Sequence, residues 1–303
     1  MTQPSRHIAI VAPSGYAADP EALRRAVERL QVQGHQVHDF CSAYEKHQRF
    51  AASDADRLRQ LHDAARHPEV EIVIALRGGY GLSRLLPGID FRLLADSGKH
   101  FVGHSDFTAL HLGLLARAGA ISFAGPMICD DFSRPDISEF TVSHFWQSLN
   151  GPMTIEISAL DNPSVDVQGK LWGGNLSMVN HLIGTPWMPE IDGGILFIED
   201  VNEHPYRIER MLLQLLHAGI LARQKAVILG DFSGYRLSDY DNGYDFEAMR
   251  AALRALLPVP LLQGLPFGHT RDKLTLPVGA MCRVRSEPAT LHLTLSDYPG
   301  LRA

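Results

Sequence analysis

The sequence predicts an α/β protein made of two parts, and three observations support this. In the first half, short apolar runs alternate with longer segments of helical spacing, which is the pattern of a parallel sheet with helices on both faces. After Asn150-Gly151-Pro152 the strands and helices follow one another less regularly. With 303 residues, of which 45% are apolar, the chain is long enough to bury the cores of two domains.

Periodicity and capping residues predict the elements of the first half. The helix after the first strand ends at Gly34, and Ser53 supplies the cap of the next helix. Ligands of such a sheet bind beyond the carboxyl ends of its strands. The predicted strands are 8–12, 36–40, 71–76 and 100–103, and the predicted helices are 20–33, 53–66, 80–86 and 106–118.

The second half is predicted to be a mixed domain. The run 153–157 alternates as a strand does, and a turn follows at Asp161-Asn162-Pro163, so we expect a domain at 1–150, a linker at 151–167 and a second domain at 168–303. The further strands are expected at 194–198, 225–229, 281–285 and 290–295, and the helices at 176–183, 205–218 and 246–256.

Charge, apolar runs and cysteine content indicate which partners the protein can bind and in which compartment it is located. The net charge of −6 shows no basic footprint, so nucleic acid and anionic membrane are not expected as partners. The first apolar run is too short for a signal segment and no stretch is long enough to span a membrane, so we expect a cytoplasmic protein. Three scattered cysteines fit neither a disulfide framework nor a zinc motif, and no metal site is expected.

The segment Phe101 to Leu110 places Ser105 between a strand and the start of a helix. A serine at such a turn projects its hydroxyl above the sheet edge, and the backbone N–H of Asp106 is free to face an oxyanion. The pattern Gly-x-Ser-x-Phe lacks the second glycine of the usual elbow motif, and a serine that caps the following helix is the alternative. The adjacent His104 is expected to point away from the serine hydroxyl and to be structural.

The loop Arg77-Gly78-Gly79-Tyr80-Gly81 follows a predicted strand directly. Its backbone N–H groups can converge on an anion, and a plain tight turn is the alternative. A dinucleotide fingerprint fails, because the third glycine position holds Arg84 and the loop does not follow the first strand. No cofactor is therefore expected.

Two further segments carry candidate acid–base residues. A strand at 194–198 is followed by Glu199 and Asp200, where a dense polar cluster favours a functional role. Near the end of the chain, a loop shaped by glycine and proline holds His269, which singles it out among 15 histidines.

Taken together, these residues resemble the LD-carboxypeptidase family, specifically its cell-wall recycling branch. The resemblance runs through nearly the whole chain, and several motifs occur in the family's order. It implies a flavodoxin-like parallel-sheet N-terminal domain, a smaller mixed, β-rich C-terminal domain, and an active site in the groove between them. The segments that carry it are Ala12-Pro13-Ser14-Gly15, Arg77-Gly78-Gly79-Tyr80-Gly81, Gly103-His104-Ser105-Asp106-Phe107-Thr108, Leu171-Trp172-Gly173-Gly174-Asn175-Leu176, Gly184-Thr185-Pro186-Trp187, Ile198-Glu199-Asp200 and Gly268-His269.

By motif, the resemblance implies a catalytic triad in which Ser105 is the nucleophile, His269 the base and later acid, and Glu199 the carboxylate that orients the imidazole. Serine needs such a base, and the base needs a partner that fixes its tautomer. The order serine, acid, histidine also matches other elbow-serine hydrolases. We expect the oxyanion to be held by the N–H groups of Asp106 and Gly79.

The resemblance implies release of the terminal D-alanine from a murein tetrapeptide by cleavage of an L,D peptide bond. The substrate carboxylate must also be bound, and Arg77 or the glycine-loop N–H groups, such as that of Gly78, are candidates. Trp172 and Asn175 are candidate groove-lining contacts, although Trp172 equally suits a packing role. The protein is expected to form a homodimer.

Two other functions remain open at this point. The first is an amide hydrolase of the same family that acts on a toxic peptide-nucleotide conjugate. The second is a ligand-binding module without catalysis, which requires Ser105, Glu199 and His269 to be unrelated in space.

Overall fold

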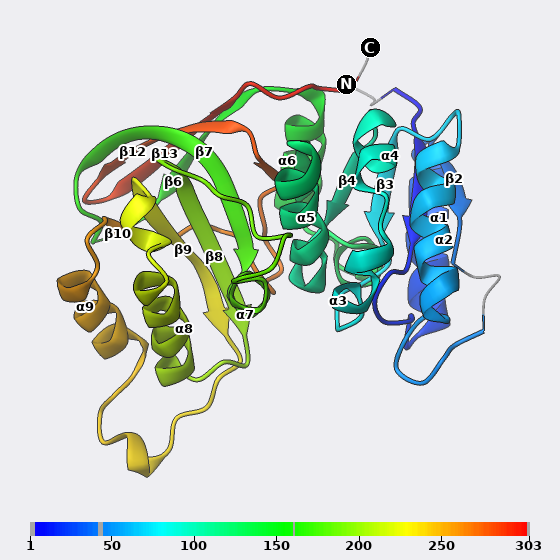
Figure 1. Cartoon of the computed structure of the whole chain (residues 1–303). Coiled ribbons are helices and arrows are strands. Elements are labelled where there is room, and N and C mark those ends of the chain that lie inside the picture. The colour runs from blue at the N-terminus through cyan, green and yellow to red at the C-terminus, as the bar shows by residue number, and fades with distance from the viewer. Residues whose placement is uncertain (1–3, 42–44, 160, 302–303) are drawn as a thin grey trace.

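The computed structural model describes residues 4–41, 45–159 and 161–301. This description leaves out residues 1–3, 42–44, 160 and 302–303. Of these, residue 160 falls within the predicted linker. The described chain forms two β-sheets, one built largely from the first half and one from the second, and helices pack on both (Figure 1). The expected α/β class with a parallel first sheet and a mixed second sheet is confirmed.

The first sheet has the order β11-β5-β4-β3-β1-β2, and its strands β1 to β5 are parallel. The order 2-1-3-4-5 is that of flavodoxin-like sheets. The sixth strand, β11, comes from the C-terminal half and pairs antiparallel with β5. The strands are β1 (His7–Val11), β2 (Gln36–Asp39), β3 (Ile72–Ala75), β4 (His100–Gly103), β5 (Ser122–Ala124) and β11 (Leu276–Val278).

Side chains cap four helices of the first half, and the Ser53 cap is the one that the sequence indicates. The other three caps are Asp19, Asp90 and Ser138. The segment expected as one helix from 106 is a short 3-10 turn, Ser105–Phe107, followed by α5. Two helices and a strand, α4, α6 and β5, were not predicted, because α4 and β5 are short and α6 is rich in β-branched and aromatic residues. The helices are α1 (Pro20–Val32), α2 (Asp54–Arg66), α3 (Leu82–Leu85), α4 (Phe91–Asp96), α5 (Thr108–Ala118) and α6 (Glu139–Asn150).

The second sheet has the order β10-β9-β8-β7-β12-β13-β6 and is parallel from β10 to β7 and antiparallel from β7 to β6. The long strand β7 was not predicted, because Gly173 and Gly174 weaken its pattern. Strand β8 continues through Glu199 and Asp200, where the prediction ended it. The strands are β6 (Met153–Ser158), β7 (Val165–Asn175), β8 (Ile195–Val201), β9 (Ala226–Ser233), β10 (Leu261–Leu262), β12 (Met281–Glu287) and β13 (Thr290–Ser296).

The helices of the second half are those that the sequence predicts: α7 (Leu176–His181), α8 (Pro205–His217) and α9 (Phe246–Leu256). The apolar side chains of α8, including Ile208 and Leu212, are buried and belong to the core. Strand β6 lies within the range expected as linker and pairs with β13 in the second sheet. The domain boundaries themselves stay a prediction.

The two halves meet where α5 packs against α7 and β7 (Figure 1). The approach is close at Gly174, where a Cβ atom would lie 2.5 Å from Oγ1 of Thr108 on α5. Gly174 also has a φ of +131°, which L side chains rarely adopt. This contact brings the carboxyl end of β8 near the helix that follows β4, and the candidate site forms there.

Candidate active site

Ser105 lies in the turn between β4 and α5, and its backbone is unusual. Its φ is 61°, a left-handed conformation that costs energy for a residue with a side chain. Such strain at a strand-to-helix turn is the geometry that raises a nucleophile above a sheet edge. The side chain is half-buried, so it remains accessible from one side.

The glycine loop after β3 leaves room for this serine. A Cβ atom on Gly78 would lie 2.8 Å from both Cβ and Oγ of Ser105, so only a residue without a side chain fits here. The next residue, Gly79, has a φ of 113°. The loop therefore runs against the serine side chain, and glycines are required for that approach.

The carboxylate of Asp106 connects the serine turn to two loops. Its Oδ2 accepts hydrogen bonds from Ser14 Oγ at 2.6 Å and from the backbone N–H of Leu82 at 2.9 Å. Leu82 begins α3, directly after the glycine loop. Burial raises the pKa of Asp106, and these hydrogen bonds and the charge of Arg57 oppose that rise. The residue after Ser105 thus holds the glycine loop in position.

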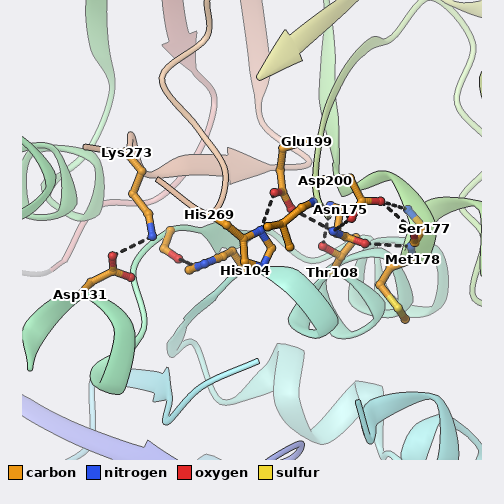
Figure 2. Close-up of polar contacts among 12 residues, drawn as sticks. His104, Thr108, Asp131, Asn175, Ser177, Met178, Glu199, Asp200, His269 and Lys273 are labelled. Atoms are coloured by element: carbon orange, nitrogen blue, oxygen red, sulfur yellow. Dashed lines mark hydrogen bonds and ion pairs between the residues drawn. The ribbon is translucent and has the colours of Figure 1, made fainter. Parts of the chain in front are cut away.

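His269 and Glu199 form the other half of the site (Figure 2). Their Nδ1 and Oε2 atoms are 2.8 Å apart. A carboxylate accepts, so Nδ1 of His269 carries the proton and Nε2 is left to act on another group. Burial lowers the pKa of His269, but the hydrogen bond and charge of Glu199 outweigh that effect and raise the pKa above its usual value.

Glu199 is fully buried and is itself held by a network of side chains (Figure 2). Asn175 Nδ2 donates to Glu199 Oε1 at 3.2 Å and to Asp200 Oδ1 at 2.9 Å. Asp200 Oδ2 also accepts from Ser177. The pairing of β8 with β9 shifts register between Ile198 and Asp200, which interrupts the alternation of side chains, and both adjacent carboxylates are buried.

The two halves are joined through the backbone of Asn175, whose N–H donates to Oγ1 of Thr108 at 3.0 Å. Thr108 begins α5, three residues after Ser105. The helix that follows Ser105 therefore contacts the network that holds Glu199 and His269.

Ser105 and His269 line one pocket of about 200 Å³, together with Arg77, Gly78 and Gly79. Within the described ranges, no hydrogen bond joins the serine hydroxyl to His269. Catalytic hydrogen bonds are often longer without substrate and tighten in the complex. The candidate triad and the glycine loop thus meet at one pocket.

Two predicted substrate contacts lie elsewhere. The indole of Trp172 is 1% exposed and donates through Nε1 to Gln224 at 2.9 Å, which is a packing arrangement. Asn175 is 6% exposed and its amide is engaged by Glu199 and Asp200. Neither side chain lines the pocket beside Ser105.

The structure adds pocket residues that the sequence interpretation did not include. His104 was expected to point away from the serine hydroxyl, but it lines the same pocket. Its ring packs edge to face against that of His269, with 5.2 Å between the ring centroids, and its Nδ1 donates to the carbonyl of Gly125. Burial, with the charges of Lys273 and His269, holds the pKa of His104 well below its usual range.

Lys273 and Arg134 also line the pocket, and Lys273 forms a buried ion pair with Asp131 at 2.7 Å (Figure 2). A signal for these residues is present in the sequence. Lys273 lies four residues after His269, and Asp131 and Arg134 follow the short strand β5, whose carboxyl end borders the site.

In residues 4–41, 45–159 and 161–301, no group of three or more His, Cys, Asp and Glu side chains is placed to hold a metal ion. In the same ranges, no helix is both long and apolar enough to cross a membrane.

The fold and this pocket define a serine-type hydrolase whose site is shared by two sheets. The profile of the LD-carboxypeptidase N-terminal domain matches residues 8–125, and that of the C-terminal domain matches residues 168–284. The protein belongs to the LD-carboxypeptidase family, and the resemblance stated from the sequence is confirmed.

Similar proteins agree with this assignment. The crystal structure of muramoyltetrapeptide carboxypeptidase from Oxalobacter formigenes is 54% identical, covers 97% of this chain and 99% of its own, and superposes with a TM-score of 0.92. The murein tetrapeptide carboxypeptidase of Pseudomonas aeruginosa is 32% identical over 90% of this chain and 91% of its own length. The microcin C7 self-immunity protein of Escherichia coli is 26% identical over 79% of this chain and 78% of its own.

Proposed function

We propose that the protein is a serine carboxypeptidase that releases the terminal D-alanine of murein tetrapeptides by cleaving an L,D peptide bond. The observation that carries this proposal is the His269–Glu199 hydrogen bond at the pocket that also holds Ser105. The names of the Oxalobacter and Pseudomonas relatives support the substrate class.

In the first step, Oγ of Ser105 attacks the carbonyl carbon of the L,D peptide bond. His269 takes the serine proton on Nε2, because its Nδ1 proton is already donated to Glu199. The buried carboxylate of Glu199 stabilises the imidazolium that forms. His269 then gives the proton to the leaving nitrogen, and the C–N bond breaks. D-alanine leaves, and the rest of the peptide stays on Ser105 as an acyl ester.

In the second step, water attacks the acyl carbon and His269 takes a proton from that water. The C–O bond to Ser105 breaks, the proton returns to the serine oxygen, and the shortened peptide leaves. The tetrahedral oxyanion of both steps is held by the backbone N–H groups of Asp106 and Gly79. Donors of this kind are worth about 3–4 kcal/mol each in comparable sites. No step requires a cofactor or a metal ion.

The second candidate is the amide hydrolase that acts on a toxic peptide-nucleotide conjugate, and the similarity to the microcin C7 self-immunity protein of Escherichia coli keeps it open. Its likeness to this chain is weaker than that of the Oxalobacter structure, at 26% against 54% identity. A module without catalysis would leave the Glu199–His269 pair beside Ser105 without a role.

The test is incubation with a tetrapeptide that ends in D-alanine and with its all-L equivalent, followed by mass analysis. We expect D-alanine to be released from the first substrate only, and EDTA to leave the rate unchanged. Release from neither peptide contradicts the proposal, as does a loss of activity in EDTA that zinc restores.

We further propose a cytoplasmic location and a homodimeric state. Cell fractionation tests the location, and light scattering of the purified protein tests the state, with a monomer at working concentration as the contradicting result.

A further inference from the structure

The pocket beside Ser105 is rich in cationic side chains, although the protein carries a net charge of −6. Arg77, Arg134 and Lys273 all line it. Lys273 is neutralised, because its ammonium is 2.7 Å from the carboxylate of Asp131 and both side chains are buried. Asp130 also lines the pocket and carries one negative charge. The two arginines therefore leave an excess of positive charge that faces a ligand.

Arg77 follows β3 on one side of Ser105, and it has few partners. Its Nη1 donates to the backbone carbonyl of Tyr16 at 3.4 Å, a long hydrogen bond. Its Nε is buried and has no hydrogen-bond acceptor. Within the described chain, no carboxylate forms an ion pair with this guanidinium. A buried donor without an acceptor is costly unless a ligand satisfies it.

Arg134 approaches from the other side, after the π-helical turn that follows β5. Its Nε donates to the carbonyl of Asp130 at 2.6 Å, and its own carbonyl accepts from Arg29 at 2.9 Å. These bonds go to backbone atoms, so they hold the residue without neutralising its charge. Asp130 is exposed, and among the described residues it makes no ion pair with either arginine.

We propose that Arg77 and Arg134 together bind the free terminal carboxylate of the substrate, an inference that rests on the proposed function. In a bound peptide, the carboxylate carbon of the last residue lies roughly 3–4 Å from the scissile carbonyl carbon, because only the amide nitrogen and one Cα separate them. The carboxylate therefore falls inside this pocket, beside the nucleophile and not on it. Guanidinium groups bind carboxylates through paired, charge-assisted hydrogen bonds.

The alternative donors of the glycine loop suit another task. The position of a Cβ on Gly78 is 2.8 Å from Ser105 Oγ, so this loop lies directly against the nucleophile. Donors this close to the nucleophile suit the oxyanion, which lies one bond from the attacked carbon. The two arginines then restrict the enzyme to the last peptide bond of a chain, because a substrate without a terminal carboxylate here leaves both guanidinium groups unpaired.

The test compares the tetrapeptide that ends in D-alanine with the same peptide that ends in D-alaninamide. We expect the wild-type enzyme to favour the acid in kcat/KM by about 10- to 150-fold, as expected for losing a hydrogen bond to a charged group. Arg77→Met and Arg134→Met should each lower kcat/KM for the acid by at least about 10-fold and leave the amide within about 3-fold. Arg77→Lys should recover part of the loss.

Arg92→Met is the matched control, because Arg92 is exposed on α4 and does not line the pocket. It should leave both substrates unaffected. Thermal melting checks that each variant folds, and Arg77→Gln and Arg134→Gln replace any methionine variant that does not.

The possible outcomes separate the two proposals. Equal hydrolysis of acid and amide by the wild type, or an equal loss on both substrates in the arginine variants, overturns the carboxylate site and leaves the peptidase assignment intact. Hydrolysis of neither peptide by the wild type overturns the proposed function itself.

Discussion

The two halves of the active site are built in different ways. On the side of the first sheet, backbone positions Ser105: a φ of 61° raises the residue, and Gly78 makes room for it. On the side of the second sheet, side chains position His269: Glu199 holds the ring at 2.8 Å, and Asn175 holds Glu199. The position of Ser105 therefore depends on the shape of the backbone around it, and the state of His269 depends on the protonation of the side chains around it.

This difference leads to opposite sensitivities. Added volume near Ser105 should displace its hydroxyl, whereas the exchange of a carboxylate for an amide of equal shape should matter little there. Near His269, the same exchange should be severe, because the tautomer and the charge both depend on it.

The largest expected effect is that of Ser105→Ala. The substitution removes the proposed nucleophile, so we expect turnover to fall by a factor on the order of 10⁴ or more, because triad members act as a unit. The hydroxyl makes no hydrogen bond in the described part of the chain, so the melting temperature should not fall. Steady-state kinetics and thermal melting measure both. Near-normal turnover in a folded variant would show that another group is the nucleophile.

Glu199→Gln should lower turnover by about 10³-fold or more, because it imposes the wrong tautomer on His269. The glutamine amide must accept from Asn175 on one atom, which turns its NH₂ toward Nδ1 of His269. The ring is then driven to carry its proton on Nε2, where it cannot act as a base.

The pH profile of this variant gives a second measurement. Glu199 raises the pKa of His269 against the effect of burial. Removing its charge lowers that pKa, so His269 stays neutral to lower pH and the acid limb of kcat/KM should move to lower pH. An acid limb at the same pH in both enzymes would mean that Glu199 does not set the protonation of His269.

Gly78→Ala tests the half that depends on shape. The new methyl group would lie 2.8 Å from Oγ of Ser105, and a displacement of the nucleophile by about 1 Å can cost on the order of 10²-fold in turnover. Gly88→Ala is the matched control, because its methyl group meets a flexible end of Leu58 at the same 2.8 Å, and Gly88 does not line the pocket. Equal turnover in the two variants would contradict a steric role for Gly78.

The sequence predicted most of the framework of this site. The alternation of elements identified the parallel sheet, and the strand β4 was predicted with its observed ends. The pairing of Glu199 with His269, implied by the family resemblance, is present at 2.8 Å. The strand and the turn are local, because each shows in a short window of sequence, whereas the pairing joins residues 70 apart and came from the family resemblance alone.

Other features that depend on the approach of distant segments, and that no motif marks, were not predicted. The side chain of Trp172 is in the core, because β7 packs between its neighbours β8 and β12. His104 lines the pocket because the loop of His269 comes from the second half of the chain. The antiparallel strand β11 has three residues and shows its role only when paired with β5.

The smallest expected effect on turnover is that of Asp106→Asn, and it completes the comparison with Glu199→Gln. The hydrogen bonds that Asp106 accepts from Ser14 and Leu82 go to the single oxygen Oδ2. An asparagine can place its carbonyl oxygen there and its NH₂ at the position of Oδ1, which has no partner. We expect turnover within about 10-fold of wild type, because the loop stays in place and only the attraction of Arg57 is lost.

Asp106→Ala is the contrasting variant, because it leaves the Ser14 hydroxyl and the Leu82 N–H without an acceptor. An unsatisfied buried group costs about 1–3 kcal/mol, so the melting temperature should fall, and the released glycine loop should lower turnover further than the asparagine does. If Asp106→Asn lost as much turnover as Glu199→Gln, the charge of Asp106 would matter to catalysis, and the division between a half set by shape and a half set by protonation would fail.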